Sequence, residues 1–121
     1  MDGRHKARRA LLQDLFACTF SGVSLERIEF PEHVVELQAI LDELPKLDAQ
    51  IKSAAPERPL EQIGKIDLAI MRLIMFESKH KQTPKKVLVD EAIELAKAYG
   101  GDGSPKFMNG VLAKLLLSET K

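Results

Sequence analysis

The sequence has little of what several protein classes depend on. It holds one cysteine, Cys18, which excludes an internal disulfide. No apolar run approaches the roughly 20 residues that a membrane-spanning helix needs. The basic N-terminus is not followed by a long apolar segment and a cleavage site, so we expect no signal peptide. With only three scattered histidines, we also expect no structural zinc site. These absences favour a reducing, cytoplasmic setting.

Catalytic motifs are missing as well, and we expect neither a catalytic residue nor a cofactor. The glycine-rich segment at residues 100–104, "GGDGS", lacks the lysine of a phosphate-binding loop and follows a predicted helix rather than a strand. Cys18 lies among apolar residues with no histidine nearby in the sequence, so we interpret it as an unreactive buried thiol. The sequence therefore predicts a protein that is not an enzyme.

What is present fits one globular domain. Of the 121 residues, 45% are hydrophobic and 30% are charged, which is enough apolar material for a core. The formal net charge is zero, but residues 1–9 carry four bases against one acid, and residues 21–62 carry nine acids against four bases. This distribution permits an anionic partner at the N-terminus and a separate protein partner in the acidic middle.

Apolar residues recur at helical spacing along almost the whole chain, and no stretch alternates with period two. We therefore predict an all-α fold, with helices at residues 4–20, 31–44, 47–54, 63–80, 84–99 and 105–116. Residues 66–76 are apolar on nearly every side, which places this helix at the centre of a bundle. Its polar residues Asp67, Arg72 and Glu77 each need a partner or a route to solvent.

Each of the other long helices has an apolar face that we expect to be buried. The predicted faces are Ala7, Leu11, Leu12, Leu15 and Phe16; Val34, Val35, Leu37, Leu41 and Leu44; Val87, Leu88, Ala92, Leu95, Ala96 and Tyr99; and Phe107, Val111, Leu112, Leu115 and Leu116.

Proline and glycine mark the predicted helix ends. Pro45 is expected to end the second helix. Thr83 and Ser104 are predicted N-caps, each followed by a proline at the first helical position. Gly100 is assigned to the left-handed position after a helix, and Gly110 to a close approach between helices.

The first predicted helix begins with "GRHKARRALLQDLF", which crowds positive charge into its first turns. Cations at a helix N-terminus oppose the helix dipole, so helix stability alone does not favour them there. The charge therefore suggests an external anion, of which phosphate is the usual one. On charge alone, a frayed and solubilising N-terminus is an equally good interpretation. The second basic cluster, at residues 79–86, is interpreted as a solvated turn.

Three segments together resemble one protein family. The segment "VLVDEAIELAKAYGGDGSPKFMNGVLAKL", residues 87–115, is similar to the C-terminal signature of the NusB family of bacterial transcription antitermination factors, with Met108 in place of the usual valine. "IGKIDLAIMRLIMFES" resembles the family's central helix, and "RHKARRALLQDLF" resembles its arginine-rich first helix. The resemblance spans almost the whole chain, and its C-terminal motif is long and specific.

This resemblance implies an all-α, NusB-like bundle of about six to seven helices. It would form one domain over residues 1–121, with a basic N-terminal helical subdomain at about 1–55 and a C-terminal one at about 60–121. The implied function is that of an RNA-binding antitermination factor. Such a factor binds boxA RNA together with NusE, a small-subunit ribosomal protein. It joins the RNA polymerase antitermination complex and supports antitermination of ribosomal RNA operons. No membrane partner is expected.

The resemblance also assigns site residues. The RNA-binding positions of the family match Arg4, His5, Lys6, Arg8, Gln13, Phe16, Tyr99, Gly103, Ser104, Lys106, Phe107 and Asn109, and those near the protein partner match Glu61 and Asp67. A basic arm provides phosphate affinity, and aromatic side chains stack on bases. Two alternatives stay open: Tyr99 and Phe107 as core residues, and Asn109 as a residue that holds the turn. We expect the Ser-Pro-Lys edge at residues 104–106 to be exposed.

The chain also departs from the family pattern. The connection before Pro31 is short, Gly103 replaces a side chain that is often polar, and Phe16 lacks the hydroxyl of the usual tyrosine. These departures keep a second hypothesis open, a NusB-like protein-interaction module or homodimer with weak or no RNA binding. A third class, an RNA cytosine methyltransferase fused to such a domain, is not expected, because the chain ends before a cofactor-binding domain begins.

Overall fold

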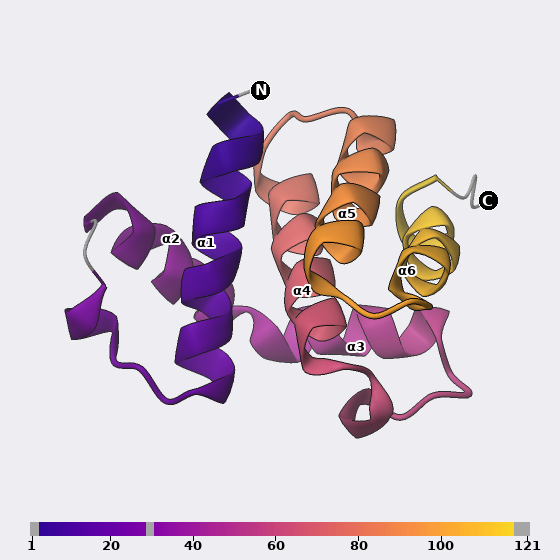
Figure 1. Ribbon diagram of the computed structural model, residues 1–121, viewed down its shortest axis with the longest axis horizontal. Coiled ribbons are helices and arrows are strands. Elements are labelled where there is room, and N and C mark those ends of the chain that lie inside the picture. The colour runs from indigo at the N-terminus through magenta and orange to yellow at the C-terminus, as the bar shows by residue number, and fades with distance from the viewer. Residues whose placement is uncertain (1–2, 29–30, 118–121) are drawn as a thin grey trace.

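The computed structural model describes residues 3–28 and 31–117, which form six α-helices and no strands (Figure 1). This confirms the all-α prediction. The helices are α1 (Gly3–Phe20), α2 (Pro31–Asp42), α3 (Leu44–Ala54), α4 (Lys65–His80), α5 (Lys85–Tyr99) and α6 (Ser104–Leu112). Short 3-10 turns, η1 (Leu25–Arg27) and η2 (Leu60–Gln62), lie in the connections, and α6 continues into a π-helical turn, η3 (Ala113–Leu117).

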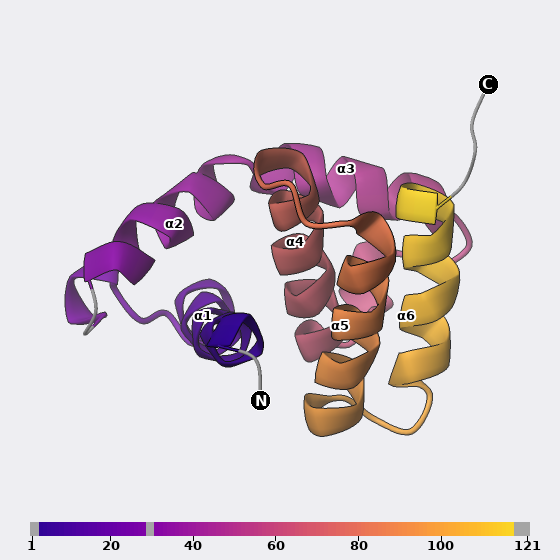
Figure 2. The ribbon, with the colours of Figure 1, turned by 90° about the horizontal axis from the view of Figure 1, so that it is seen from above.

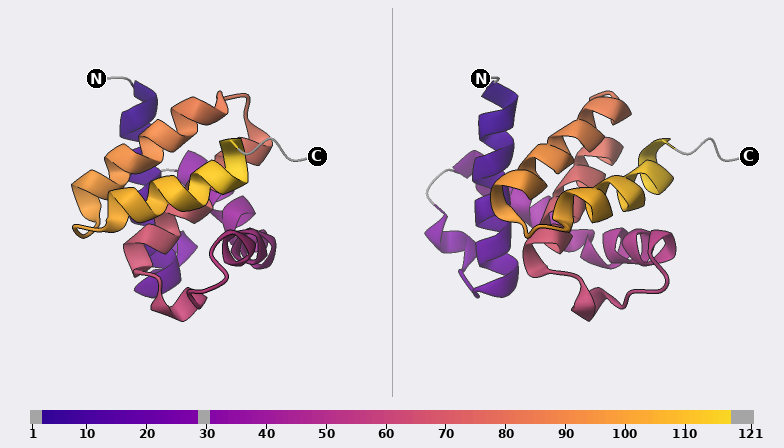
Figure 3. Two further views of the ribbon diagram at one scale, coloured as in Figure 1. Left: turned by 90° about the vertical axis from the view of Figure 1, so that its right-hand side faces the viewer. Right: turned by 45° about the vertical axis from the view of Figure 1, so that its right-hand side comes forward.

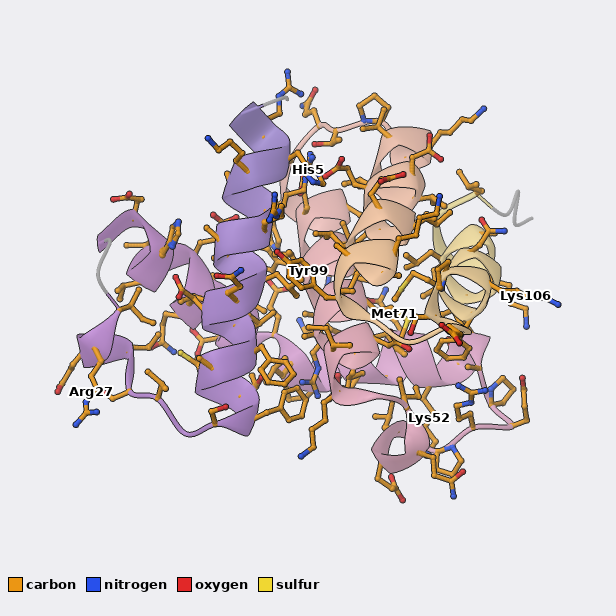
Figure 4. The ribbon with its side chains drawn as sticks, in the orientation of Figure 1. His5, Arg27, Lys52, Met71, Tyr99 and Lys106 are labelled. Carbon is orange, nitrogen blue, oxygen red and sulfur yellow. The ribbon has the colours of Figure 1, made fainter. Side chains whose placement is uncertain are left out.

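Helix α4 lies at the centre of the bundle, as its apolar composition predicts. Helix α1 packs on one side of it, α5 and α6 lie on the other, and α3 crosses its end (Figures 1 and 2). Figure 3 shows α5 and α6 side by side. Every residue of α4 from 67 to 77 is buried, and Met71 sits in the interior (Figure 4). The arrangement of the other helices therefore depends on the surface of α4.

The three charged residues within the buried part of α4 each find a partner on a different helix. Asp67 Oδ2 accepts a hydrogen bond from Ser104 Oγ of α6 at 2.9 Å, Arg72 donates to both carboxylate oxygens of Asp48 on α3 at 2.8 and 2.9 Å, and Glu77 accepts two bonds of 2.8 Å from Arg8 on α1. Unpaired buried charge is costly. These contacts therefore fix how α1, α3 and α6 are placed on α4.

Helix α2 is attached to the bundle differently. Leu37 and Ile40 are fully buried, and His33 Nδ1 lies 2.8 Å from Asp14 Oδ2 of α1. Val35 was expected on the same buried face, but 74% of its surface is exposed, so that prediction was wrong. Helix α2 stands away from α4 in the ribbon (Figure 2), so the face that carries Val35 is not covered.

Two further apolar positions differ from prediction in the same way. Ala7 and Val87 are exposed, and both lie in or near the first turns of their helices, at the end of the bundle. Conversely, Val89 and Met108 are buried although neither was predicted. Helical spacing identifies one face of a helix but does not show how far along the axis its neighbours extend.

The predicted caps were wrong because buried carboxylates of α4 use both hydroxyls. Helix α5 begins at Lys85, after Pro84, and Thr83 Oγ1 donates to Glu77 Oε2 at 2.7 Å instead of capping. Ser104 is the first residue of α6 rather than its cap. Pro45 does not end α2. It lies in the first turn of α3, where a missing N–H costs no helical hydrogen bond.

Gly100 is required, but not for the predicted reason. Its φ is −91°, so it does not adopt the left-handed conformation. A Cβ at this position would lie 2.5 Å from Ser104 Oγ and 2.9 Å from the Ala96 carbonyl oxygen. Only glycine therefore lets Ser104 approach the end of α5. Gly110, in contrast, is exposed, and a Cβ there would meet no atom within 4 Å, so it does not mediate a close approach of helices.

Candidate nucleic-acid interface

The first turns of α1 expose positive charge. Arg4 and Lys6 are exposed, and the first turn of α1 contains no acidic residue. His5 is half-buried, with Nδ1 2.8 Å from Glu91 Oε1 of α5 (Figure 4). The surface at this end of α1 can therefore attract an anion through Arg4 and Lys6, while His5 lies against α5.

Arg8 does not belong to that exposed surface. Its side chain is 8% exposed, hydrogen bonded to both oxygens of Glu77, and 3.1 Å from Glu91 Oε1. The bond to Glu77 raises the pKa of Arg8. Burial alone would raise the pKa of Glu77, but bonds from Arg8 and Thr83 outweigh burial and lower it. The charge of Arg8 is thus held inside the fold by two carboxylates, and its role in RNA binding stays a prediction.

Further along α1, polar side chains cross to the end of α5. Arg9 Nε donates to the Tyr99 hydroxyl at 3.0 Å, and Gln13 Nε2 donates to the same oxygen at 3.4 Å. The hydrogen bond from Arg9 lowers the pKa of Tyr99 below its ordinary value of 10.0. Tyr99 is half-buried, so the interpretation of Tyr99 as only a core residue was wrong: its ring packs against the core while its hydroxyl belongs to a polar surface cluster.

The turn after α5 and the start of α6 contribute the other predicted positions. Gly103, Lys106 and Asn109 are exposed, and Lys106 points outward (Figure 4). Within residues 3–28 and 31–117, the Asn109 side chain makes no hydrogen bond, so it does not hold the turn. Ser104 was expected at an exposed edge but is buried, donating to Asp67 and accepting from the Gly101 N–H.

Phe107 is half-buried, and its ring already has a partner. The Arg58 guanidinium carbon lies 4.2 Å from the ring centroid, within the range of a cation–π contact. Arg58 is exposed and comes from the connection between α3 and α4. The structure therefore combines both interpretations of Phe107: one part packs on the core, and one face forms a surface with Arg58.

The predicted RNA-binding residue Phe16 and the predicted protein-partner residues Glu61 and Asp67 occupy different environments. Phe16 is half-buried and packs against Phe20, with ring centroids 5.2 Å apart. Phe20 and Glu61 line a pocket of about 370 Å³ between α1, α3, the η2 turn and α4. Asp67 is only 8% exposed and faces Ser104, so it supports this region from inside the bundle rather than presenting a charge on the surface.

The other candidate groups for chemistry are the Cys18 thiol and the metal-ligating side chains. Burial raises the pKa of the half-buried Cys18 thiol, and Asp14 adds to the shift, which is the direction of an unreactive thiol. No group of three metal-ligating side chains occurs in the described part of the chain. Within the same residues, no helix is long and apolar enough to cross a membrane.

Sequence reasoning missed Arg9 and Arg58 as members of this surface. Arg9 was counted only as charge, although its spacing of four from His5 and from Gln13 places all three on one face of α1. No local signal identifies Arg58, because its contact with Phe107 joins a loop to a helix far along the chain. Figure 2 shows that the end of α5 and the start of α6 lie on the side of the molecule away from α3.

The fold is that of a small all-helical bundle, with a basic and polar surface formed by α1, the end of α5 and the start of α6. The model of the NusB family matches residues 35–116. The NusB transcription antitermination protein of Campylobacter curvus (strain 525.92) is 37% identical over 130 residues, covering 95% of this chain and 97% of the relative. That of Roseiflexus castenholzii (strain DSM 13941 / HLO8) is 35% identical, covering 93% and 91%. The chain belongs to the NusB family of transcription antitermination factors, which are not enzymes.

A solved structure agrees with this assignment. T. maritima NusB superimposes with a TM-score of 0.82 at 25% sequence identity, covering 99% of this chain and 94% of the other. The resemblance read from the three sequence motifs is thereby confirmed, and with it the NusB-like bundle. The division into subdomains at residues 1–55 and 60–121 stays a prediction, and α3 of the first part contacts α4 and α6 of the second.

Proposed function

We propose that this protein binds boxA-type RNA together with NusE and supports antitermination of ribosomal RNA operons as part of the RNA polymerase complex, in the cytoplasm. The observation that carries the proposal is the exposed pair Arg4 and Lys6 at the start of α1, in a turn without acidic residues. Cations at that position do not stabilise the helix, so an external polyanion explains them better than helix stability does.

The remaining surface fits single-stranded RNA. Lys106 and Asn109 are exposed on α6, and Tyr99 and Phe107 each present part of an aromatic ring beside a cation. Single-stranded RNA is recognised by base stacking and edge hydrogen bonds, while cations contact its phosphates. The RNA-binding set that we propose therefore contains Arg4, His5, Lys6, Gln13, Phe16, Tyr99, Gly103, Lys106, Phe107 and Asn109, with Arg8 and Ser104 as supporting residues inside the fold.

NusE is proposed to dock beside the pocket that contains Glu61. Phe20 and Lys65 line this pocket together with Glu61, so a partner would meet an aromatic ring between charges of both signs. The Lys65 ammonium lies 5.8 Å from the Phe20 ring centroid. Asp67, one residue before the pocket-lining Leu68, keeps α6 in place through Ser104.

Replacing Arg4 and Lys6 together by alanine is expected to weaken RNA binding about 10-fold, because two phosphate contacts are lost. The slope of log affinity against log salt should fall by about 1.4, at roughly 0.7 for each phosphate on a single strand. The measurement is a fluorescence-anisotropy titration of a boxA RNA with NusE present, over a salt series.

The matched control is the double variant Lys46→Ala/Lys52→Ala, which removes the same charge from exposed positions on α3. Its affinity and salt slope should stay close to those of the unmodified protein. If both double variants change binding equally, the effect is one of net charge, and α1 is not a binding surface. If NusE binds normally but RNA does not, in the unmodified protein, the chain is a protein-interaction module instead.

A further inference from the structure

The polar cluster of Arg9, Gln13 and Tyr99 has a hydrogen-bonding arrangement that the proposed function does not by itself explain. Residues 9 and 13 lie one turn apart on α1, and both donate to the hydroxyl of Tyr99 at the end of α5. Arg9 also lies over the Tyr99 ring, with its guanidinium carbon 6.0 Å from the centroid. The cluster therefore bridges two helices at the surface, above α4.

The Tyr99 hydroxyl can still donate its proton in a hydrogen bond. A phenolic oxygen accepts up to two hydrogen bonds and donates one. Arginine nitrogens only donate, so the 3.0 Å contact from Arg9 Nε must use a lone pair of the oxygen. The 3.4 Å contact from Gln13 Nε2 uses the other. Within the described residues no acceptor is bonded to the phenolic proton, so it is available to a ligand.

Arg9 has donors to offer as well. Its Nε is bonded to Tyr99, whereas no hydrogen bond or ion pair from its two η nitrogens is formed within residues 3–28 and 31–117. Its side chain is half-buried, and the contact with Tyr99 restricts where the guanidinium can lie. A phenolic O–H and a guanidinium edge are thus held side by side with a full positive charge, and no acceptor among the described residues is bonded to the phenolic proton or to the η nitrogens.

We propose that Arg9 and Tyr99 form a clamp for one phosphate group of the bound RNA, in which the Tyr99 hydroxyl and the Arg9 η nitrogens donate to its oxygens. This inference rests on the proposed RNA-binding function and assigns a contact within it. A phosphate fits better than a base edge, because it offers several acceptor oxygens and the negative charge that matches Arg9. The lowered pKa of Tyr99 makes its O–H a stronger donor and is consistent with this role.

The test compares Tyr99→Phe, Arg9→Gln and Arg9→Lys in the anisotropy titration with boxA RNA and NusE. Tyr99→Phe keeps the ring and removes only the donor, and we expect about 10-fold weaker binding from the loss of one hydrogen bond to a charged group. Arg9→Gln should weaken binding at least as much and lower the salt slope by about 0.7. Arg9→Lys should keep the slope but lose affinity, because lysine lacks the planar edge that binds two oxygens.

A panel of RNAs, each with one base changed, identifies the contacted group. A phosphate clamp predicts that Tyr99→Phe weakens binding to every RNA by the same factor, whereas loss of preference at one base position would overturn the phosphate assignment. Unchanged affinity for Tyr99→Phe or Arg9→Lys, with Arg4→Ala/Lys6→Ala still weakened, would overturn the clamp and leave the proposed function standing. If Arg4→Ala/Lys6→Ala also binds RNA normally, the proposed function itself fails. Thermal unfolding of each variant verifies that the fold is intact.

Discussion

Replacing Arg8 with methionine is expected to lower the free energy of unfolding by about 3–5 kcal/mol, which is typical of removing one partner of a buried ion pair. Arg8 donates two 2.8 Å bonds to Glu77 and lies 3.1 Å from Glu91. Methionine fills a similar volume but leaves the buried carboxylate of Glu77 with only the bond from Thr83. The measurement is urea unfolding followed by circular dichroism. Lys6→Met, an exposed position on the same helix, is the control and should change stability by no more than about 0.5 kcal/mol.

The pH dependence of this loss identifies Glu77 as its cause. In the unmodified protein the pKa of Glu77 is below its ordinary 4.5, so the pair stabilises the fold above that pH and loses its contribution as pH falls through the lower value. Without Arg8, the effect of burial exceeds that of the remaining partners and raises the pKa of Glu77. As the pH falls, Glu77 of the variant therefore becomes protonated, and the cost of its unpaired buried charge is removed. The stability difference should therefore narrow as the pH falls, beginning above pH 4.5, where Glu77 of the variant takes up its proton, and ending below pH 4.5, where Glu77 of the unmodified protein does. A difference that stays constant from pH 7 to pH 4 would show that lost packing, not unpaired charge, destabilises the variant.

Gly100→Ala is expected to cost about 3 kcal/mol, because an added methyl group would lie 2.5 Å from Ser104 Oγ and 2.9 Å from the Ala96 carbonyl oxygen. Neither can move freely: the Ala96 carbonyl accepts the Gly100 N–H of the last turn of α5, and Ser104 holds Asp67. Displacing Ser104 would leave the buried Asp67 carboxylate without its 2.9 Å hydrogen bond, which adds to the steric cost. Thermal unfolding and the same urea titration measure the effect.

The neighbouring Gly101→Ala is the matched control. A Cβ at residue 101 would meet no atom within 4 Å, and its φ lies outside the left-handed region. That substitution should leave stability unchanged or raise it by about 0.4–1 kcal/mol, by restricting the unfolded chain. Equal losses from both substitutions would mean that the turn needs backbone freedom throughout, rather than space beside Ser104 alone.

The fold was largely predictable from the sequence because helical periodicity and the central apolar helix are local signals. The N-caps and the burial of residues near the helix ends could not be predicted in this way. Thr83 and Ser104 have the right residue type and spacing for N-caps, but Glu77 and Asp67 of α4 bind both hydroxyls. Local propensity favours a cap worth about 1 kcal/mol, whereas leaving a buried carboxylate unpaired costs more. The stronger requirement comes from a residue distant in sequence, so it is visible only in three dimensions.

The candidate site was predictable in outline and not in detail. The basic character of α1 and the exposed Lys106 follow from the sequence, and the family motifs indicate Tyr99 and Gln13. The prediction placed Arg8 in the RNA-binding set and left out Arg9, although these adjacent arginines point in different directions. Arg8 lies between two carboxylates, and Arg9 lies on the surface against Tyr99. Which arginine is buried depends on the rotation of α1 against α4 and α5, which the residues of α1 alone do not determine.

The contacts of Asp67, Arg72 and Glu77 on α4 form with partners that are synthesised at different times. The chain leaves the ribosome from its N-terminus, so Arg8 and Asp48 are already present when their partners Glu77 and Arg72 emerge. Asp67 is different, because Ser104 follows it by 37 residues. Helix α4 can thus pack against α1 and α3 first. Its face toward α5 and α6 stays uncovered until those two helices have been synthesised. Completion of the nascent fold depends on the C-terminal signature that also identifies the family.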